Sequence, residues 1–346
     1  MIVTLEEEKK WIYSILESLG ASSEEATISS NVLSEGDLRG YSSHGIMRLK
    51  YMVSGVKSGT LKIPSDPKFK IIRENIGHMD GDHGLGHFVT TKATKEAINM
   101  CDKYGIALIG INNSNHYGMA GIYAEAITEK DMIGIILSSS DPVVHAIGGI
   151  DRVMGTNSLS IGIPGKDGPV LLDMATSEAS RGKILEARRR GKKIPENWAI
   201  SSDGKITDDP ATALSGALNP FGGIKGFGIS LIISIMAGAF VGAEMGSNVR
   251  GTLDLKETCT KGDLIIAIDP YIFEDKQTFS NKVETFISEI KNSRKIPGVD
   301  EIVIPGERSR KKRADGLKKG YEIDESTLNE LRNLLASFSI ECPFMV

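Results

Sequence analysis

Apolar residues recur at helical spacing at both ends of the chain. Within residues 5–60 they recur every three or four positions, and 328–335 repeats this pattern near the C-terminus, which predicts amphipathic helices in both segments. Two of the helices begin with capping-box signatures, namely Thr4 with Glu7 and Ser22 with Glu25. Because the chain ends of a domain commonly lie close together, we expect one helical region formed by residues 1–70 plus 310–346.

The middle of the chain alternates between two patterns. Helical spacing at 90–104 and 116–129 alternates with short apolar, β-branched runs that are typical of buried strands. The strand candidates are 106–111, 132–137, 159–163, 170–173, 264–268 and 301–304. This alternation predicts an α/β fold in which parallel strands are covered by helices on both faces. We assign 71–309 to this central region, with the charged, turn-rich segment 186–210 as an exposed excursion.

One apolar run allows two interpretations. From Gly226 to Ala243, eighteen residues pass without a charge, which is the lower limit for a helix that crosses a membrane. A helix that is apolar on all sides is equally expected in the centre of a large soluble protein. No second span and no aromatic belt accompany the run, so we predict a buried helix and no membrane partner.

Composition and charge narrow the class of protein. Of the 346 residues, 40% are hydrophobic and 25% charged, an ordinary balance for a soluble globular protein. Lys and Arg number 41 against 45 Asp and Glu, a net charge of −4, so no overall positive field attracts nucleic acid. Three widely spaced cysteines without a CxxC pair suit a reducing, cytoplasmic setting. The acidic start MIVTLEEEKK lacks the basic segment of an export signal.

The two common nucleotide-binding fingerprints, GxGxxG after a strand and GxxxxGK[ST], are absent from the sequence. GGIKGFG at 222–228 instead places Lys225 among four glycines, ahead of the apolar run. Glycines expose backbone N–H groups at a helix start and the lysine adds positive charge, and both suit a phosphate. A tight turn that needs positive φ explains the same glycines without a ligand.

A cluster of histidines raises the alternative of a metal-dependent hydrolase. Four of the six histidines fall within forty residues: His78, His83, His87 and His116. His83 and His87 are four apart, which on a helix would place both on one face. Gly84 and Gly86 argue against a regular helix there, and no HExxH motif is present. We therefore interpret these histidines as polar residues at the rim of a loop, and we predict no metal site.

The segment YSSHGIMRLKYM, 41–52, carries a more specific signal. If Ser42 or Ser43 caps a helix, His44 and Arg48 lie at i and i+4 and project from the same face. Two neighbouring cationic groups disfavour each other's charge unless an anion lies between them. The pair therefore suits a carboxylate, which an arginine can hold through two parallel hydrogen bonds. A small 2-oxo or 2-hydroxy acid meets this requirement, although an ordinary exposed pair has the same spacing.

A second histidine stands in the motif SNHYGMAG. If Asn115 caps a helix, His116 lies in the first turn, where the positive end of the helix dipole lowers an imidazole pKa. Such a histidine can accept a proton near neutral pH. The small residues that follow allow a flat ring or a phosphate to approach. The simpler alternative is a histidine that only caps the helix.

These stretches together resemble one family, the type-2 malate/L-lactate dehydrogenases, which are separate from the Rossmann enzymes of similar name. The family also contains sulfolactate, ureidoglycolate and piperideine-2-carboxylate oxidoreductases. The matching motifs occur in family order along nearly the whole chain: SSHGIMRL, DGDHGLGH, NSNHYGMAG, GTNSLSIGIP, LDMATSEASRGKI, NPFGGIKGFG, CTKGDLIIAIDP and IPGE. The resemblance implies a three-layer α/β fold with a mixed-sheet core, a non-Rossmann NAD(P)-binding site and a homodimer.

The resemblance also implies roles for individual residues. His116 corresponds to the acid/base, Ser43 with His44 to a second proton-handling pair, and Arg48 to the ligand of the substrate carboxylate; the branches of the family differ in which histidine moves the proton. Thr156 matches a substrate contact, and Arg181 is a candidate for a second anionic group. The positions that resemble cofactor contacts are Ser140, Asp173, Met174, Ala175, Lys225, Gly306, Glu307 and Arg308.

The implied reaction is interconversion of a 2-hydroxy acid and its 2-oxo acid with NAD or NADP. Malate and oxaloacetate are the preferred pair, with L-sulfolactate and sulfopyruvate, or another acid of the family, as alternatives. The basic run RSRKKR, 308–313, suits either the 2′-phosphate of NADP or a solvated face. A catalytically silent binding protein is disfavoured by the intact set of Ser43, His44, Arg48 and His116.

Overall fold

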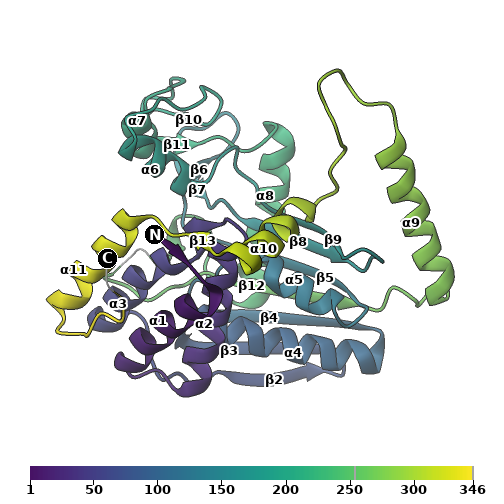
Figure 1. Ribbon diagram of the computed structural model, residues 1–346, viewed down its shortest axis with the longest axis horizontal. Coiled ribbons are helices and arrows are strands. Elements are labelled where there is room, and N and C mark those ends of the chain that lie inside the picture. The colour runs from purple at the N-terminus through teal and green to yellow at the C-terminus, as the bar shows by residue number, and fades with distance from the viewer. Residues whose placement is uncertain (253–254, 345–346) are drawn as a thin grey trace.

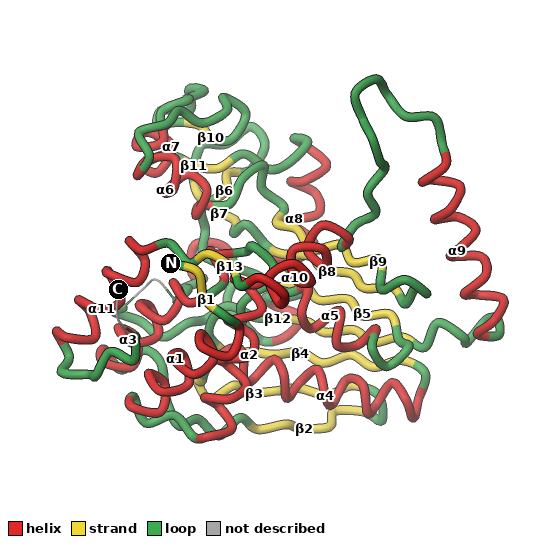
Figure 2. Tube along the Cα trace, in the orientation of Figure 1, coloured by secondary structure: helices red, strands yellow, loops and turns green. Residues whose placement is uncertain are grey.

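A computed structural model describes residues 1–252 and 255–344, and a seven-stranded sheet lies at its centre (Figures 1 and 2). In sheet order the strands are β2 (Lys68–Arg73), β3 (Ile76–Gly84), β4 (Ile106–Ser114), β12 (Asp263–Ile268), β5 (Ile133–Ser138), β8 (Ser158–Ile163) and β9 (Val170–Ala175). Only β3 and β4 pair in parallel, and the other neighbouring strands of this sheet are antiparallel. The predicted parallel sheet is therefore wrong, because β12 returns from far along the chain and inserts between β4 and β5.

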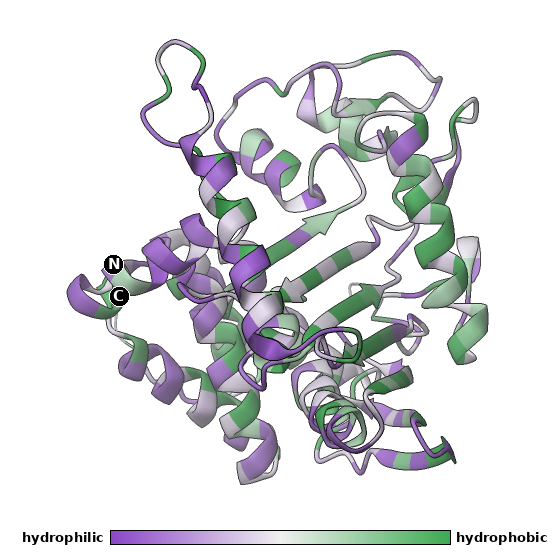
Figure 3. Ribbon diagram, turned by 90° about the vertical axis from the view of Figure 1, so that its right-hand side faces the viewer, coloured by the Kyte–Doolittle hydropathy of each residue, from purple (hydrophilic) through white to green (hydrophobic). Residues whose placement is uncertain are grey.

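Helices cover both faces of this sheet, which gives the three layers implied by the family resemblance. On one face lie α4 (Gly86–Tyr104) and α5 (Gly121–Thr128), whose buried Ala97 and Ala124 belong to the same core cluster as Ile109 and Ile265. On the other face, Ile233 of α8 (Ile224–Met236) packs in a cluster with strand residues that include Leu137 and Leu264. The central strands alternate green with grey in the hydropathy view, whereas the helices near the two chain ends mix purple and green (Figure 3).

The two ends of the chain share one hydrophobic cluster beside the sheet. This region comprises β1 (Ile2–Val3), α1 (Leu5–Ser18), α2 (Ser23–Leu38), α3 (Leu49–Ser58), β13 (Tyr321–Glu322) and α11 (Glu325–Ser337). Ile12, Leu33 and Leu331 lie in the same buried cluster, and β1 pairs with β13. Both predicted capping boxes are confirmed at the starts of α1 and α2. The N- and C-terminal labels lie close together in Figure 1.

A smaller sheet forms a lobe above the central one (Figure 1). Its strands are β10 (Ala199–Ile200), β11 (Ala217–Leu218), β6 (Val144–His145) and β7 (Arg152–Met154). The helices α6 (Arg181–Arg189) and α7 (Pro210–Ser215) complete it, and Ile184, Ile194 and Ala213 share its small core. Segment 186–210 thus supplies part of this lobe.

The predicted burial of the apolar run is wrong for one face of α8. Residues 224–241 are long and apolar enough to span a membrane by length and composition, but only 33% of this window is buried. Several large side chains of the helix are at least 39% exposed: Ile224, Ile229, Leu231, Ile232 and Ile235. The helix packs against the sheet on one side only, because nothing in the described part of this single chain covers its outer face.

Two further helices follow β12. The helix α9 (Lys276–Asn292) projects from the body of the molecule, and α10 (Glu307–Lys319) returns to it (Figure 1). The predicted strand at 301–304 is wrong. The backbone N–H of Ile304 donates to the Glu307 carboxylate at 2.9 Å instead of to a neighbouring strand, so this run is the approach to a helix.

Candidate active site

Ser43, His44 and Arg48 lie on a compact turn and not on the helix that their spacing predicted. Two 3-10 turns, η1 (Ser42–His44) and η2 (Ile46–Arg48), meet at Gly45, and α3 begins only after Arg48. The turn still brings the side chains together. Ser43 Oγ and His44 Nδ1 are 2.9 Å apart, and Arg48 Nε donates to the Ser43 carbonyl at 2.6 Å. Within residues 1–252 and 255–344, no hydrogen bond or ion pair involves the terminal nitrogens of Arg48.

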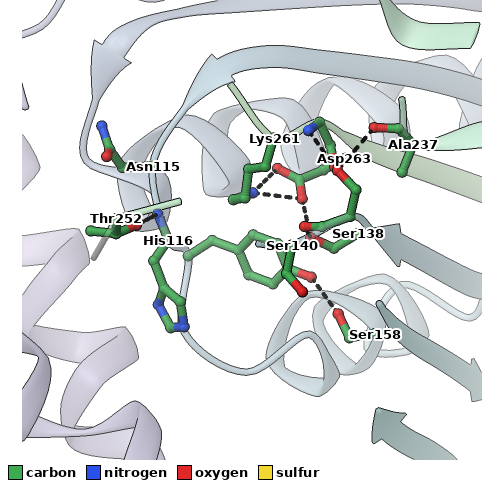
Figure 4. Close-up of polar contacts among 12 residues, drawn as sticks. Asn115, His116, Ser138, Ser140, Ser158, Ala237, Thr252, Lys261 and Asp263 are labelled. Carbon is green, nitrogen blue, oxygen red and sulfur yellow. Dashed lines mark hydrogen bonds and ion pairs between the residues drawn. The ribbon is translucent and has the colours of Figure 1, made fainter. Parts of the chain in front are cut away.

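His116 lies in the loop between β4 and α5, not in a helical turn. Asn115 does not cap a helix, because its side-chain amide donates to the carbonyls of His83 and Gly84 at 2.8 and 3.1 Å. Gly118, with φ of +85°, turns the chain so that its N–H donates to His116 Nδ1 at 3.1 Å. The backbone N–H of His116 in turn donates to Thr252 (Figure 4). With Nδ1 as the acceptor, the neutral His116 ring carries its proton on Nε2.

The two candidate catalytic histidines face each other. The ring centroids of His44 and His116 are 5.5 Å apart. A third ring, that of His87, has its centroid 6.5 Å from that of His116. His87 is fully buried, and neither of its ring nitrogens has a hydrogen-bond partner in the described part of the chain. Burial and then the Arg48 charge lower the pKa of His44 to about 3. Burial, followed by Arg48 and His44, holds the pKa of His116 well below its usual value. Both rings are therefore neutral near neutral pH, through burial and a neighbouring cation rather than a helix dipole.

The sequence prediction missed a buried ion pair beside His116. Lys261 and Asp263 are 6% and 0% exposed, and the Lys261 ammonium donates to both Asp263 oxygens at 2.7 and 2.5 Å. Ser138 Oγ also donates to Asp263 (Figure 4). Lys261 lies 4.7 Å from the centroid of the Tyr117 ring, which joins the pair to the residue after His116. The charged KGD step before the apolar β12 run was the available signal.

The candidate substrate residues come from two sides of this centre. Gly182, at the start of α6, is so near the turn that an added Cβ would lie 3.4 Å from Ser43 Cβ. Its neighbour Arg181 lines a pocket with Arg152, and the Arg181 side chain makes no hydrogen bond or ion pair within residues 1–252 and 255–344. Ser140 Oγ and Thr156 Oγ1 are 3.3 Å apart, so these two predicted residues are brought together.

One acidic residue among these cations was also missed. Burial raises the pKa of Asp141, while the charges of Arg181, Arg48 and Lys261 act in the opposite direction. An added Cβ at Gly251 would meet its carboxylate at 1.4 Å, so the loop at Gly251 lies against Asp141. The charge of this carboxylate offsets part of the positive field that the three cations create.

The predicted cofactor residues near β9 lie at separate points along this strand and not in one cluster. Glu307 and its neighbours Gly306 and Arg308 lie near the start of the strand, where the Leu171 N–H donates to the Pro305 carbonyl at 3.0 Å. Met174 and Ala175 end the strand near the glycine loop, since the Phe221 N–H donates to the Thr176 carbonyl. The Asp173 side chain instead accepts the N–H of Gly121 at the start of α5, at 2.9 Å. The family motifs therefore mark the two ends of an extended strand.

The glycine loop before α8 fits a phosphate of a dinucleotide. Gly222 and Gly223 have φ of +55° and +63°, and nothing lies within 4 Å of the space that a side chain on either would fill. Lys225 is exposed in the first turn of the helix, which has no side-chain cap. An open helix N-terminus beside a lysine is an arrangement that binds phosphate. The residues present are thus compatible with NAD or NADP.

The histidine cluster does not form a metal site. Within the described ranges, no group of three His, Cys, Asp or Glu side chains is placed to hold a metal ion. His78 turns its Nε2 to the Val241 carbonyl at 3.1 Å. His83 belongs to β3 with φ of +55°, whereas His87 is buried in α4. The hydrolase alternative therefore has no site in this part of the chain.

The fold and this site define an oxidoreductase that acts on 2-hydroxy acids, and comparisons with known proteins agree. The family model described as "Malate/L-lactate dehydrogenase" matches residues 3–332. The malate/(S)-sulfolactate dehydrogenase of Methanothermus fervidus is 40% identical over 99% of both chains, and the malate dehydrogenase of Pyrococcus abyssi is 39% identical over 94% of this chain and 91% of its own. The sulfolactate dehydrogenase structure from Methanocaldococcus jannaschii superposes with a TM-score of 0.91 at 40% identity, covering 99% and 98% of the two chains.

The chain belongs to the malate/L-lactate dehydrogenase family, and it is a 2-hydroxyacid dehydrogenase. Relatives named for NAD(+) and for NADP(+) both match it. The three-layer fold and the family membership implied by the motifs are confirmed.

Proposed function

We propose that the enzyme interconverts malate and oxaloacetate with NAD or NADP. The observations that carry this proposal are that the charges of both Arg48 and Arg181 act on Asp141, and that Gly182, next to Arg181, lies against Ser43. A dicarboxylate has one anionic group for each, and Arg48 offers the terminal nitrogens that a bidentate contact needs. The cofactor supplies or accepts the hydride at C4 of its nicotinamide.

The geometry supports different roles for the two histidines. Because Gly118 donates to Nδ1 of His116, the proton on Nε2 can be donated in a hydrogen bond to the substrate oxygen, which becomes negative as hydride arrives at C2. His44 can hold its own proton on Nδ1 against Ser43 Oγ, which leaves Nε2 as the acceptor. In the oxidation direction His44 then takes the hydroxyl proton. Reduction needs the protonated ring to return it, and the negative charge of the bound oxo acid favours that form of His44.

L-Sulfolactate and sulfopyruvate are the second candidate pair. The malate/(S)-sulfolactate relative and the sulfolactate dehydrogenase structure support it by their names, and a sulfonate presents an anion to Arg181 as a second carboxylate does. Purified enzyme should be assayed with NADH and NADPH, each against oxaloacetate, sulfopyruvate and pyruvate, by the loss of reduced-cofactor absorbance. Turnover with pyruvate alone would contradict a dianionic substrate, and no turnover with any of these oxo acids would contradict the substrate proposal.

Replacing Arg181 by alanine should separate dianionic from monoanionic substrates. We expect KM for the preferred dianion to rise roughly 10- to 150-fold, because one hydrogen-bonded charge contact contributes roughly 1.5–3 kcal/mol, while kcat/KM for pyruvate changes less than about twofold. Initial rates with both oxo acids measure this, with the exposed Arg190 replaced by alanine as the control. An equal change for both substrates would remove Arg181 from the specificity site.

We also propose a cytoplasmic homodimer that associates through the outer face of α8. The support is the set of exposed isoleucine and leucine side chains on that helix, since an apolar patch of this kind marks an interface more often than a solvated surface. Replacing Ile232, 55% exposed, by aspartate should halve the mass measured by light scattering, while Ile206→Asp, at a 71% exposed position elsewhere, should not. An unchanged mass in the first variant, or a monomeric wild type, would contradict the α8 interface.

A further inference from the structure

The turn that carries Ser43, His44 and Arg48 rests on a buried carboxylate. Asp37, in the last turn of α2, accepts the backbone N–H of Ile46 at 2.6 Å. A Cβ added to Gly45 would lie 1.8 Å from Asp37 Oδ2, so the backbone between His44 and Ile46 lies directly on the carboxylate. Neither η1 nor η2 has a side-chain cap. Because short 3-10 turns have poor internal hydrogen-bond geometry, the contact with Asp37 is a principal anchor of this turn.

A second carboxyl group lies behind the first. Glu8 of α1 is 0% exposed, and its side chain is within hydrogen-bonding reach of Asp37. The Tyr321 hydroxyl of β13 donates to Glu8 Oε2. Glu8 Oε1 is buried and receives no donor from the described part of the chain. Two carboxylates are both acceptors, so they can bond to each other only when one of them holds a proton.

The surroundings of the pair favour that proton. Burial and then Asp37 raise the pKa of Glu8 well above its usual value, and burial raises the pKa of Asp37 to about 6. The groups that face the pair are the Tyr321 hydroxyl and the Ile46 N–H, with Glu35 acting on Tyr321 from beyond it. No cation is among the groups that shift either pKa. Like charges in a buried site cannot both persist without a large cost.

We propose that Asp37, through one proton shared with Glu8, is a positioning residue for the His44–Arg48 turn. Tyr321 orients Glu8, the shared proton holds Glu8 against Asp37, and Asp37 fixes the Ile46 N–H. Asp37 thereby sets where His44 Nε2 and the Arg48 guanidinium stand relative to the substrate. The inference rests on the proposed roles of those two residues, and it adds three residues that touch neither substrate nor cofactor.

The first test compares two replacements of Asp37. Asp37→Ala removes the anchor and should lower kcat/KM for the oxo acid about 100-fold, the size of effect that a displacement of about 1 Å produces. The dissociation constant of NAD(P)H, from its fluorescence, should change less than about twofold, because the turn holds substrate groups. Asp37→Asn keeps an acceptor for Ile46 and a donor for Glu8, and should retain activity within about threefold. Equal losses in both variants, or parallel losses of cofactor binding, would show a merely structural role.

The second test needs no turnover. Because the pKa values of Asp37 and Glu8 are raised in the folded protein, the folded state binds more protons than the unfolded chain. The contribution of this pair to the free energy of unfolding therefore falls as the pH rises from the pKa values of the unfolded chain, near 4, through those of the folded protein. Glu8→Gln replaces the shared proton by an amide N–H that cannot be lost. The unfolding midpoint of wild type should therefore fall more steeply with rising pH than that of Glu8→Gln.

If the unfolding midpoint changed equally with pH in the wild type and in Glu8→Gln, the proposal of a shared proton would be wrong. Asp141 and Asp173, whose pKa values are also raised, contribute equally to both proteins, so the difference isolates the pair. If wild-type enzyme reduces none of the oxo acids, the proposed function fails, whereas the unfolding measurement still decides whether Asp37 and Glu8 share a proton.

Discussion

Replacing His44 by glutamine should reduce kcat by two to four orders of magnitude, the usual contribution of a general acid or base. The same replacement at His116 should cost only about tenfold, because the glutamine amide can still donate a hydrogen bond from the position of Nε2. The contrast follows from the different partners of the two Nδ1 atoms. The Gly118 N–H donates to Nδ1 of His116 at 3.1 Å, whereas Ser43 Oγ lies 2.9 Å from Nδ1 of His44. Single-turnover rates with saturating cofactor measure the chemical step in both variants.

The pH dependence of oxidation checks the same assignment. Burial and Arg48 lower the pKa of His44 to about 3, so the neutral ring that accepts the proton is the main form at all higher pH. We therefore expect kcat/KM for the hydroxy acid, which reports the free enzyme, to show no loss attributable to histidine between about pH 8 and 5. A larger loss of kcat in His116→Gln than in His44→Gln would mean that His116 is the general acid/base and His44 the hydrogen-bond donor.

The local features of the fold were predictable from the sequence, whereas strand direction was not. The capping boxes at Thr4 and Ser22 and the strands β4, β5, β8, β9 and β12 depend on neighbouring residues and are confirmed. The direction of β12, which starts at Asp263, depends on its pairing with β4 and β5, which end at Ser114 and Ser138, and a local apolar pattern does not encode a pairing over that separation. The exposed face of α8 was missed for a related reason: an uncharged run shows that a surface is apolar, not what covers it.

Individual glycines account for the local errors in the site. Spacing placed His44 and Arg48 on one helix, but the turn breaks at Gly45, whose space is filled by the Asp37 carboxylate. Spacing also placed His116 in a helix, but Gly118 adopts φ of +85° and α5 begins later. In both cases the residue types were sufficient to suggest carboxylate and proton chemistry. The supporting residues Lys261, Asp263 and Asp37 are buried. The KGD step indicates a charged pair at Lys261 and Asp263, but the contacts of that pair with Tyr117 and Ser138, and of Asp37 with Ile46, join segments that the local sequence does not relate.

Replacing Arg48 by alanine should lower kcat/KM for the oxo acid about a thousandfold, and replacement by lysine about a hundredfold. Removing one partner of a hydrogen-bonded charge pair costs roughly 2–5 kcal/mol, and lysine restores the charge without the two parallel N–H groups. Lysine also lacks the Nε donor that bonds the Ser43 carbonyl at 2.6 Å, so the turn loses an internal contact. Steady-state rates over a range of oxo acid concentrations give kcat and KM separately.

The control for this prediction is Arg190→Lys, at an exposed arginine paired with Glu186 on α6, which should leave both constants unchanged. Because Arg48 is assigned to the substrate and not to the cofactor, NAD(P)H should bind all three variants with the affinity of the wild type. Normal catalytic efficiency in Arg48→Lys would mean that the carboxylate is held elsewhere. Arg181 would then be the remaining arginine candidate, and Arg181→Ala would have to lower kcat/KM for pyruvate as well as for the dianion.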